Sequence, residues 1–311
     1  MKAVVCTAYG PPEVLRLRER SAPRLRRKGV RIRVVATAVT ASDVLIRGLK
    51  FGGWRRYLLR AAFGWKAPRS VLGMIVAGEV EAVGRSVTEF KPGDHVFGMD
   101  GFRAGTYAEE VCWPATAALA LKPANLTFEE AAALPYGALI ASHFIRRLQL
   151  RKGQRVLVYG ASGAIGTATV QLARHLGAEV TGVCSTANLD LVRSLGAGAV
   201  IDYTKDDFTQ DGPYDVIFDA VGKRKSARAM ATAGAALATG GILMSVDDSF
   251  PRTKVGDLVA LQQLVAAGEF RPVIDRKYPL EEIVEAHRYV ELGHKKGNVI
   301  ITVGTGSHSR D

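Results

Sequence analysis

Hydrophobic and polar positions along the chain follow two different rhythms, which change near residue 125. In the first part, short apolar runs alternate with turns rich in Gly and Pro and no long helical period occurs, which predicts a β-rich, partly barrel-like domain. The strands expected there cover residues 2–6, 30–40, 78–83, 95–98 and 107–113. The aromatic and basic segment 54–65 is compatible with a helical lid over a pocket and with a packed surface helix.

Strand and helix patterns alternate in the second part, which begins with the helix-start signal of Thr127, Glu129 and Glu130. Such alternation is typical of βαβ units in a parallel, doubly wound sheet. We expect strands at residues 155–159, 179–184, 199–202, 216–219 and 242–246. We expect helices at residues 163–176, 188–195 and 225–238, two further helices after residue 254, and a closing strand at 298–303.

One strand–turn–helix segment, RVLVYGASGAIG at residues 155–166, has the layout of a dinucleotide-binding fingerprint. Gly163 and Gly166 take the places of its second and third glycines, and Ala161 takes that of the first. The backbone N–H groups of residues 162–165 would hold a pyrophosphate, unless the turn merely connects strand and helix. The residues assigned to this cradle are Ala161, Ser162, Gly163, Ala164, Ile165 and Gly166.

The end of the next expected strand bears on which nicotinamide cofactor is used. An Asp or Glu there would accept a hydrogen bond from a free ribose 2′-hydroxyl, but the chain reads VCSTAN at residues 183–188 and has no carboxylate. Ser185, Thr186 and Asn188 can donate to a 2′-phosphate, which favours NADPH. Ser185 or Thr186 could instead cap the following helix, and the two roles can coexist.

Composition agrees with a globular protein of two domains, since the 311 residues are 48% hydrophobic and 23% charged. No apolar run reaches the roughly 18 residues that span a bilayer, and the N-terminus has no signal-peptide layout. The three cysteines are too scattered for a disulfide framework, so we expect a cytoplasmic protein without membrane contact. The net charge of +12 is spread, apart from clusters at 16–33 and 55–66, and favours a phosphate-friendly surface over nucleic-acid binding.

Several longer phrases carry a resemblance to one family over nearly the whole chain. They are AYGPPEVL, LGMIVAGEVEAVGRSVTEFKPGDHVFG, GTYAEE, GASGAIGTATVQLARHLGAEV, SLGAGAVIDYTKDDF, YDVIFDAVG and GHKKGNVIITV. On these phrases the chain resembles the zinc-independent quinone oxidoreductase (zeta-crystallin-like) branch of the medium-chain dehydrogenase/reductase superfamily. The resemblance implies an α/β protein with a GroES-like, β-rich catalytic domain (residues 1–124 and 268–311). It also implies a Rossmann NADPH-binding domain with a doubly wound parallel sheet (residues 125–267).

The resemblance implies further cofactor contacts outside the fingerprint. It places Tyr203 at the adenosine phosphate region and Asn298 where it closes the site. The residues that it places along the ribose and nicotinamide are Ala220, Val221 and Val246. Ile140 stands where the family usually has a threonine near the nicotinamide, so one polar contact is expected to be replaced or lost.

Zinc-dependent members of the superfamily hold their catalytic metal with a Cys and a His that this chain lacks. Thr40 stands where the Cys precedes Asp43 by three residues, and Met74 stands where the His follows Gly73. The three scattered cysteines cannot form a four-thiolate structural site either, so we expect no metal. The histidines that could be nominated as ligands by type alone, and that we interpret as ordinary packed or surface residues, are His95, His143 and His175.

Without zinc, the resemblance implies transfer of hydride from NADPH to a quinone or an α,β-unsaturated carbonyl, which needs only hydrogen-bond polarisation of the carbonyl. Ser42 stands where relatives keep a proton-relay hydroxyl, so Thr40 and Ser42 are the candidate catalytic residues. Both could equally be strand-end residues that support the pocket through Asp43. The candidate pocket residues are Asp43, Tyr57 and Tyr136. The alternative function is an NADPH-binding protein of the same fold with little turnover, in a crystallin-like or RNA-binding role.

The segment after GGILMSVDD is shorter than the family pattern. The family usually continues through a further strand at the sheet edge, whereas SFPRTKVGDL follows here. We therefore expect the Rossmann sheet to lack that edge strand. Because related subunits commonly pair along this edge, we expect a monomer or an atypical homodimer that uses another surface.

Overall fold

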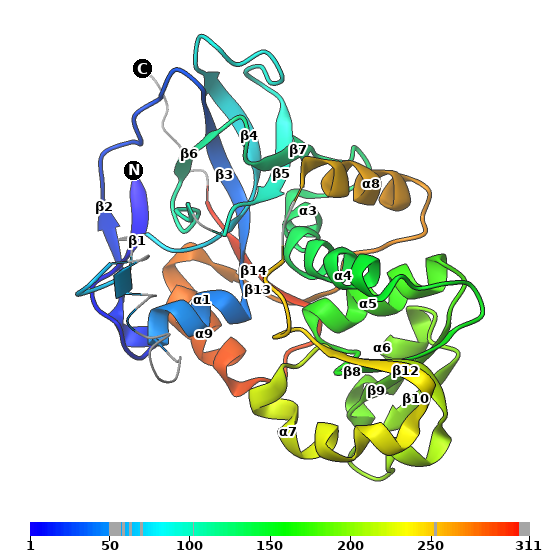
Figure 1. The fold of residues 1–311 in the computed structure, drawn as a ribbon. Helices are drawn as coiled ribbons and strands as arrows, with labels where there is room; N and C mark the ends of the chain where they lie inside the picture. The colour runs from blue at the N-terminus through cyan, green and yellow to red at the C-terminus, as the bar shows by residue number, and fades with distance from the viewer. Residues whose placement is uncertain are drawn as a thin grey trace. The chain divides into compact units, whose positions relative to one another are not determined.

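The structure is a computed structural model that describes residues 1–49, 57, 60–61, 64–68, 71–101, 103–251 and 254–304. Tertiary contacts divide the chain into two compact units. The first unit joins Met1–Pro135 to Ile274–Asp311, and the second is Tyr136–Val273. Figure 1 colours the end of the chain, which belongs to the first unit, orange to red. Trp54, where the expected lid segment begins, lies outside the described residues.

Antiparallel pairing dominates the first unit. Within the described residues its main sheet has the order β13-β14-β3-β4-β5-β7, and β6 pairs with β3. The strands are β3 (Gly29–Val39), β4 (Ile75–Val83), β5 (His95–Met99), β6 (Glu110–Pro114), β7 (Ala118–Leu121), β13 (Ile274–Pro279) and β14 (Asn298–Thr302). A two-stranded sheet is formed by β1 (Lys2–Cys6) and β2 (Leu15–Glu19). Because β14 pairs with β3, both ends of the chain build one β-rich domain, as the resemblance implied.

Alternation of side chains explains why β3 lies inside this sheet. Ile32 and Val34 are buried, whereas Arg33 between them is half-buried and pairs with Glu79 on β4. The apolar face of β3 contributes to a core that also contains the fully buried ring of Trp113. The strand expected at residues 30–40 is therefore present, as β3.

The helices of the first unit determine where that unit ends. Those with described bounds are α1 (Ala41–Gly48), α3 (Phe128–Ala132) and α9 (Ile283–Leu292). α1 packs against α9, and the buried guanidinium of Arg47 on α1 pairs with Glu291 on α9 at 2.6 Å. α3 packs against β3, β4 and β5, and the first unit extends to Pro135. The boundary expected from the sequence was after residue 124.

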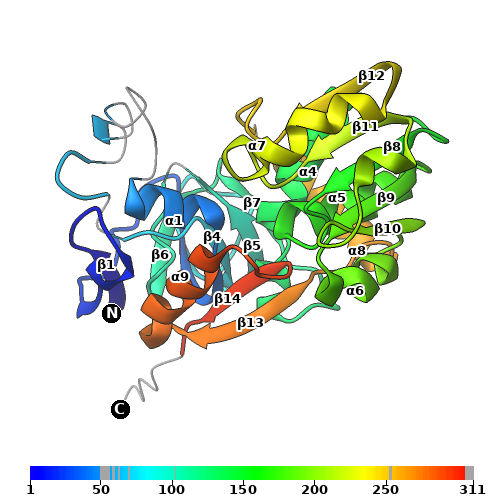
Figure 2. The same cartoon turned by 90° about the horizontal axis from the view of Figure 1, so that it is seen from below.

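A parallel five-stranded sheet forms the centre of the second unit, with the order β10-β9-β8-β11-β12 among the described residues. The strands are β8 (Arg155–Tyr159), β9 (Glu179–Cys184), β10 (Ala199–Asp202), β11 (Tyr214–Asp219) and β12 (Leu237–Ser245). The helices are α4 (Pro135–Leu148), α5 (Ala164–His175), α6 (Leu189–Ser194), α7 (Lys223–Thr232) and α8 (Val255–Ala266). Figure 2 shows the strands side by side in this order. The predicted doubly wound sheet is confirmed, and its described part ends at β12.

Some elements differ from the sequence-based expectation. β2, β7 and β13 were not predicted. β2 and β13 are edge strands rich in charge, and β7 is apolar but has only four residues, too few to show a period. A helix was expected to reach residue 238, but α7 ends at Thr232 and β12 already begins at Leu237. The short 3₁₀ turns are η1 (Pro12–Val14), η2 (Thr186–Asn188), η3 (Phe208–Asp211), η4 (Ala233–Ala236) and η5 (Leu280–Glu282).

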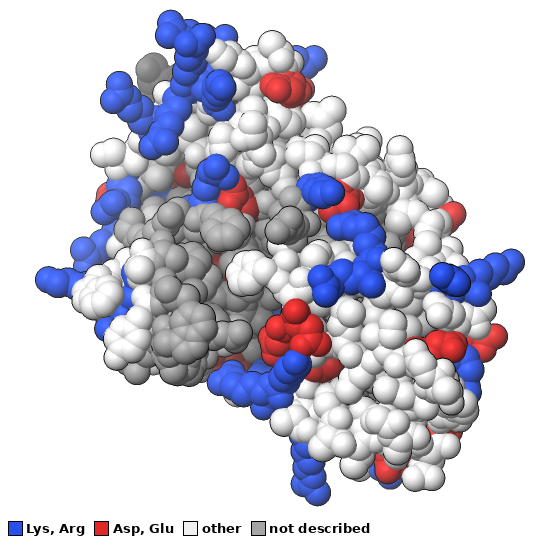
Figure 3. Space-filling view, viewed as in Figure 1, with Lys and Arg blue, Asp and Glu red and all other residues white. Residues whose placement is uncertain are grey.

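Basic side chains occur at several separate places on the face that Figure 3 shows, and Asp and Glu lie beside some of them. The most extensive group of Lys and Arg is at the upper left of that view. Among the described helices, none is long and apolar enough to cross a membrane.

Candidate functional site

The turn between β8 and α5 is held by backbone hydrogen bonds. Gly160 begins the turn with a φ of 78°, a conformation that favours glycine. The N–H groups of Gly160 and Ala161 donate to the carbonyl oxygen of Val183 on β9, at 3.0 and 2.9 Å. The N–H of Gly163 donates to the carbonyl oxygen of Gly160 at 3.1 Å, so this predicted phosphate donor is engaged inside the turn.

Two glycines of the fingerprint differ in what the fold demands of them. A Cβ on Gly166 would overlap the carbonyl oxygen of Gly160, so α5 can approach the strand end so closely only with glycine at this position. A Cβ on Gly163 would lie 3.6 Å from the same oxygen, which is ordinary contact. The protein itself therefore does not require glycine at position 163, whereas close approach of a pyrophosphate to this turn would.

The first backbone N–H groups of α5 lie beside this turn. The N–H groups of Ala164 and Ile165 have no acceptor within the helix, because the first turn of any helix lacks one. The positive end of the helix dipole adds to the attraction for an anion. Helix α4 packs directly against this end, since a Cβ on Gly137 would overlap the carbonyl oxygen of Ala164. Tyr136, beside Gly137, is only 7% exposed, so little of this predicted pocket residue is accessible.

Predicted residues from two loops meet at the end of β9. Asn188 is buried and donates from Nδ2 to the Oγ atoms of Ser162 and Ser185, at 3.1 and 3.2 Å. The backbone N–H of Asn188 also donates to the carbonyl oxygen of Ser185 at 2.9 Å. Both serines are half-buried. The amide of Asn188 therefore joins the β8–α5 turn to the loop that follows β9.

Thr186 has a different partner. Its hydroxyl donates to the carboxylate of Asp202, which also accepts from the N–H and the hydroxyl of Thr204 at 3.0 and 2.7 Å. Asp202 ends β10 and lies in register with Cys184, the last residue of β9. The hydrogen bond from Thr186 lowers the pKa of Asp202. A carboxylate thus does lie beside the end of β9, and the sequence did not reveal it because it belongs to the neighbouring strand.

Tyr203 follows Asp202 at the same edge of the sheet. Its N–H donates to the carbonyl oxygen of Cys184 at 3.1 Å, and its ring centroid lies 6.4 Å from that of Tyr159. The side chain is 47% exposed. The ring is therefore accessible to a ligand at the carboxyl ends of β9 and β10.

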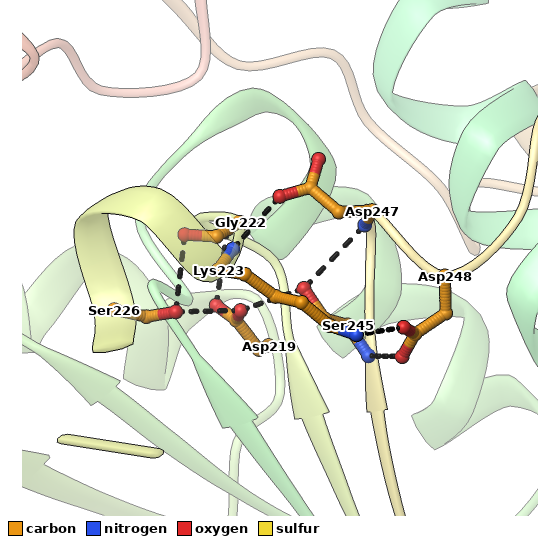
Figure 4. Close-up of polar contacts among 7 residues, drawn as sticks. All are labelled: Asp219, Gly222, Lys223, Ser226, Ser245, Asp247 and Asp248. Carbon is orange, nitrogen blue, oxygen red and sulfur yellow. Dashed lines mark hydrogen bonds and ion pairs between the residues drawn. The ribbon is translucent and has the colours of Figure 1, made fainter. Parts of the chain in front are cut away.

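A buried carboxylate organises the carboxyl ends of β11 and β12 (Figure 4). One oxygen of Asp219 accepts from the hydroxyls of Ser226 and Ser245, at 2.7 and 2.8 Å. The other accepts from the N–H groups of Val221 and Gly222, at 3.0 and 3.1 Å. Four donors thus satisfy a carboxylate that is fully buried, and they fix the turn that contains Val221.

Lys223 extends this network to the loop after β12 (Figure 4). Its N–H donates to Asp247 at 2.8 Å, and its ammonium group pairs with Asp248. The N–H groups of Ala220 and Val246 donate to carbonyl oxygens at the strand ends, at 3.0 and 2.9 Å. The predicted residues Ala220, Val221 and Val246 therefore lie around the hydrogen-bond network of Asp219, which was not predicted. The sign of this network in the sequence is Asp219 itself, the second Asp of YDVIFDAVG.

In the first unit, Thr40 and Asp43 form a capping box at the start of α1. The Thr40 hydroxyl donates to the Asp43 carboxylate at 2.6 Å, and each side chain accepts from the other residue's N–H, at 2.9 and 3.2 Å. The sulfur of Met74 lies 3.9 Å from the same hydroxyl. Because a hydroxyl has one proton, Thr40 gives it to Asp43 and can only accept from further groups.

Asp43 is only 1% exposed, so little of this predicted pocket residue is accessible to a ligand. Besides Thr40, the nearby Gly73 N–H and Tyr107 hydroxyl also act to lower the pKa of Asp43. Burial raises the pKa of Asp43 to about 6 in spite of these donors. Burial also holds the pKa of Tyr107 well above its ordinary range, so Tyr107 remains a donor at neutral pH. Ser42, in the first turn of α1, is half-buried and thus more accessible than Thr40, which is 3% exposed.

The other predicted residues of the first unit differ in accessibility. Tyr57 is 62% exposed, whereas Asn298, the first residue of β14, is 6% exposed and lies in register with Ile274. Each nominated histidine has a local partner: His95 packs against an aromatic ring, His143 bonds to a serine hydroxyl and His175 pairs with a glutamate. Over the described residues, no three His, Cys, Asp or Glu side chains are grouped as a metal site would need.

Comparison with protein families agrees with this arrangement. Residues 26–123 match the family described as alcohol dehydrogenase GroES-like domain, and residues 195–301 match the family described as zinc-binding dehydrogenase. A GroES-like β domain together with a parallel dinucleotide-binding sheet defines the class of medium-chain dehydrogenases/reductases.

Individual relatives refine the assignment. The chain is 33% identical to the NADPH-dependent alkenal/one oxidoreductase of Arabidopsis thaliana and 34% identical to the 2-methylene-furan-3-one reductase of Solanum lycopersicum, over 97% of this chain and 79% of each relative. The solved quinone oxidoreductase from Coxiella burnetii superposes with a TM-score of 0.86 at 28% identity, over 98% of this chain and 99% of that one. The chain belongs to the medium-chain dehydrogenase/reductase superfamily, in its zinc-independent quinone oxidoreductase branch, which confirms the resemblance.

Proposed function

We propose that the chain transfers hydride from NADPH to the conjugated double bond of an α,β-unsaturated carbonyl compound or to a quinone. The observation that carries this proposal is the β8–turn–α5 segment, in which the protein itself does not require glycine at Gly163 and the first amides of α5 have no acceptor within the helix. The names of the two curated relatives support reduction of conjugated carbonyl compounds with NADPH.

The residues at the end of β9 fit a cofactor with a 2′-phosphate. Ser185 offers a half-buried hydroxyl there, and the nearby Asp202 is 4% exposed and already accepts from two threonines. Asp202 is therefore a poor acceptor for a free ribose 2′-hydroxyl. Neutral donors without an accessible carboxylate favour NADPH over NADH.

Polarisation of the substrate oxygen is assigned to Ser42. When bound, the nicotinamide supplies the hydride. The substrate carbonyl needs a hydrogen-bond donor, and the Thr40 proton is already given to Asp43. Ser42 lies two residues further along, in the first turn of α1, and is more accessible. Thr40 and Asp43 then act as positioning residues, because their capping box fixes the start of the helix that carries Ser42.

The reaction is proposed to run without zinc. Thr40 and Met74 hold the places of the zinc ligands of zinc-dependent relatives, and a hydroxyl bonded to a carboxylate and a thioether are unsuited to zinc. Hydride addition to a conjugated alkene requires less Lewis-acid assistance than oxidation of an alcohol to an aldehyde. Metal analysis of the purified active protein should therefore find no stoichiometric zinc, and one zinc per chain whose removal abolishes activity would contradict the proposal.

The non-catalytic alternative is not favoured. The relatives are named as oxidoreductases and reductases. An NADPH-binding protein without turnover would bind the cofactor but leave it unoxidised in the presence of every enone and quinone tried.

Steady-state oxidation of NADPH with a panel of enones, enals and quinones tests the function. We expect turnover with conjugated carbonyl compounds and very slow reduction of NADP⁺ by simple alcohols. Ser42→Ala should lower kcat on the order of 10²-fold, the usual effect of losing a donor to a developing oxyanion. Thr40→Ser, which keeps the capping hydroxyl, is the matched control and should retain activity. Full activity of Ser42→Ala would remove Ser42 from the mechanism.

A further inference from the structure

The side-chain amide of Asn188 bridges two serines that were assigned to different parts of the cofactor site. It lies in the 3₁₀ turn after β9 and is 6% exposed. Its Nδ2 is 3.1 Å from Ser162 Oγ, in the turn before α5, and 3.2 Å from Ser185 Oγ, at the end of β9. An amide nitrogen has two protons, so it can donate to both serines at once.

These hydrogen bonds determine where the serine protons point. Each serine hydroxyl accepts from Asn188, so its own proton must be directed away from that amide. Among the described residues, neither Ser162 nor Ser185 donates to a protein group. Both side chains are half-buried and not sealed in the core. The two hydroxyls are therefore held as outward-facing donors.

The opposite orientation of the amide would be less favourable. It would place the Asn188 oxygen between the serines and turn two buried N–H donors toward the position of Oδ1, which has no hydrogen-bond partner. A carbonyl oxygen without a partner is tolerated better in a protein interior than an unpaired N–H. The orientation that directs the serine protons outward thus leaves fewer buried donors unsatisfied.

The neighbouring threonine shows the contrasting arrangement. Thr186 gives its proton to the Asp202 carboxylate, which also accepts from Thr204. Thr186 can therefore present lone pairs but not a proton to a ligand, and lone pairs repel a phosphate. Ser185 accepts from an amide and can donate to a ligand, whereas Thr186 donates to a carboxylate and can only accept from a ligand.

We propose that Asn188 is a positioning residue for cofactor selection: it orients the hydroxyl protons of Ser162 and Ser185 toward the phosphate oxygens of the cofactor. This inference rests on the proposed NADPH dependence. Ser162 belongs to the turn assigned to the pyrophosphate, which NADPH and NADH share, so its orientation affects both. Ser185 lies at the strand end assigned to the ribose, so its orientation favours the 2′-phosphate and hence NADPH.

Titration of the cofactors into Asn188→Ala and Asn188→Asp tests the proposal without turnover. The alanine variant leaves both hydroxyls free to rotate, and we expect it to lower the NADPH-to-NADH affinity ratio at least threefold. The aspartate variant is nearly isosteric but only accepts, so it draws the serine protons inward and adds negative charge. We expect it to lower the ratio at least tenfold. Adenosine 2′,5′-bisphosphate and 5′-AMP, titrated in the same way, should show the same loss for the 2′-phosphate alone.

Two controls separate positioning from damage to the fold. Ser194→Ala removes a hydroxyl at the other end of α6, which donates to the Leu191 carbonyl at 2.7 Å, and should leave the ratio unchanged. In a Ser185→Ala background, Asn188→Ala should have no further effect on the ratio, because the hydroxyl that it orients for the 2′-phosphate is gone. Thermal melts establish that each variant is folded.

The outcomes distinguish this inference from the proposed function. A wild-type protein that binds NADPH selectively without oxidising it would overturn the function but support the role of Asn188. A wild-type protein that reduces enones with NADPH, together with folded Asn188 variants that keep the wild-type affinity ratio, would overturn the role of Asn188 alone. Equal wild-type affinities for NADPH and NADH, or additive effects of the Ser185 and Asn188 substitutions on the ratio, would also contradict it.

Discussion

The group that receives a hydroxyl proton decides what that side chain can do in this site. Thr40 and Thr186 both give their protons to buried carboxylates, whereas Ser185 accepts from an amide. The sequence indicates that polar residues follow β9, but it does not show that Asp202 is folded beside them. The sequence therefore predicts which residues have hydroxyl or amide groups at this site. Whether each group donates to a ligand or accepts from it depends on contacts between separate strands.

The preference for NADPH is the clearest consequence at the residue scale. We expect the wild-type protein to bind NADPH at least about tenfold more tightly than NADH, which corresponds to roughly 1.4 kcal/mol. Ser185→Asp should reverse the preference, because a carboxylate repels the 2′-phosphate and accepts from a 2′-hydroxyl. Fluorescence titration of both cofactors measures this, and an unchanged ratio in the variant would show that Ser185 lies away from the ribose.

His287 predicts a pH dependence of stability. The side chain on α9 is fully buried, its ring contacts Tyr107 edge-on at 5.7 Å, and neither ring nitrogen has a hydrogen-bond partner in the described structure. Burial, with a smaller contribution from the nearby Arg47 charge, lowers the pKa of His287 to about 3. Because the folded state holds the neutral form, the associated stability is full above the ordinary pKa of about 6.5 and is lost as the pH falls toward 3.

Replacement of His287 by leucine should remove this acid sensitivity. Between pH 7 and pH 5, the free energy of unfolding of the wild type should fall by roughly 2 kcal/mol relative to that of His287→Leu. Denaturant titrations at both pH values give the two differences, and the exposed His294→Leu is the control that should show no such change. A constant difference between wild type and His287→Leu would mean that His287 can be protonated in the folded protein.

At the scale of elements, two glycines of the turn between β8 and α5 are expected to have different roles: Gly166 in helix packing and Gly163 in cofactor binding. Gly166→Ala should destabilise the protein by roughly 1–3 kcal/mol, because the added Cβ forces α5 away from Gly160. Gly163→Ala should leave the melting temperature nearly unchanged, since its Cβ would lie 3.6 Å from the Gly160 carbonyl oxygen. It should weaken binding of both cofactors, because the added methyl group lies where the pyrophosphate is proposed to approach the turn. Thermal melts and cofactor titrations of the two variants would contradict this division if both lost stability equally.

Elements with a clear run of apolar residues could be predicted from the sequence. Elements that form only because they pair with a neighbouring strand could not. β8, β9 and β11 are central parallel strands, so burial on both faces produces continuous apolar runs such as RVLVY and YDVIF. β13, with the sequence IDRKYP, is held at a sheet edge by pairing with β14, and its own residues give no apolar signal. The Asp219 network was missed for the same reason, because Ser226 and Ser245 reach it from separate elements.

The expected oligomeric state concerns the whole molecule. β12 ends the described sheet, and its pairing with β11 is irregular before Val216, so only Ile242–Ser245 forms a regular run. Because the described sheet has no further strand beyond β12, we expect a monomer or a homodimer that uses another surface. Light scattering gives the mass, and Leu243→Lys on the exposed edge should not change it. A wild-type dimer that Leu243→Lys dissociates would place the interface at this edge.

We expect the protein to deliver the hydride of NADPH to the β carbon of an α,β-unsaturated carbonyl compound and not to its carbonyl carbon. NADPH carrying deuterium at the nicotinamide C4 position, on the face from which this enzyme takes hydride, tests it most directly with a simple enone as acceptor. Both C4 diastereomers are tried, and the product is analysed by mass spectrometry and NMR. We expect a saturated ketone with one deuterium at the former β carbon from one diastereomer. An allylic alcohol labelled at the carbonyl carbon, or no label in any product, would contradict the account.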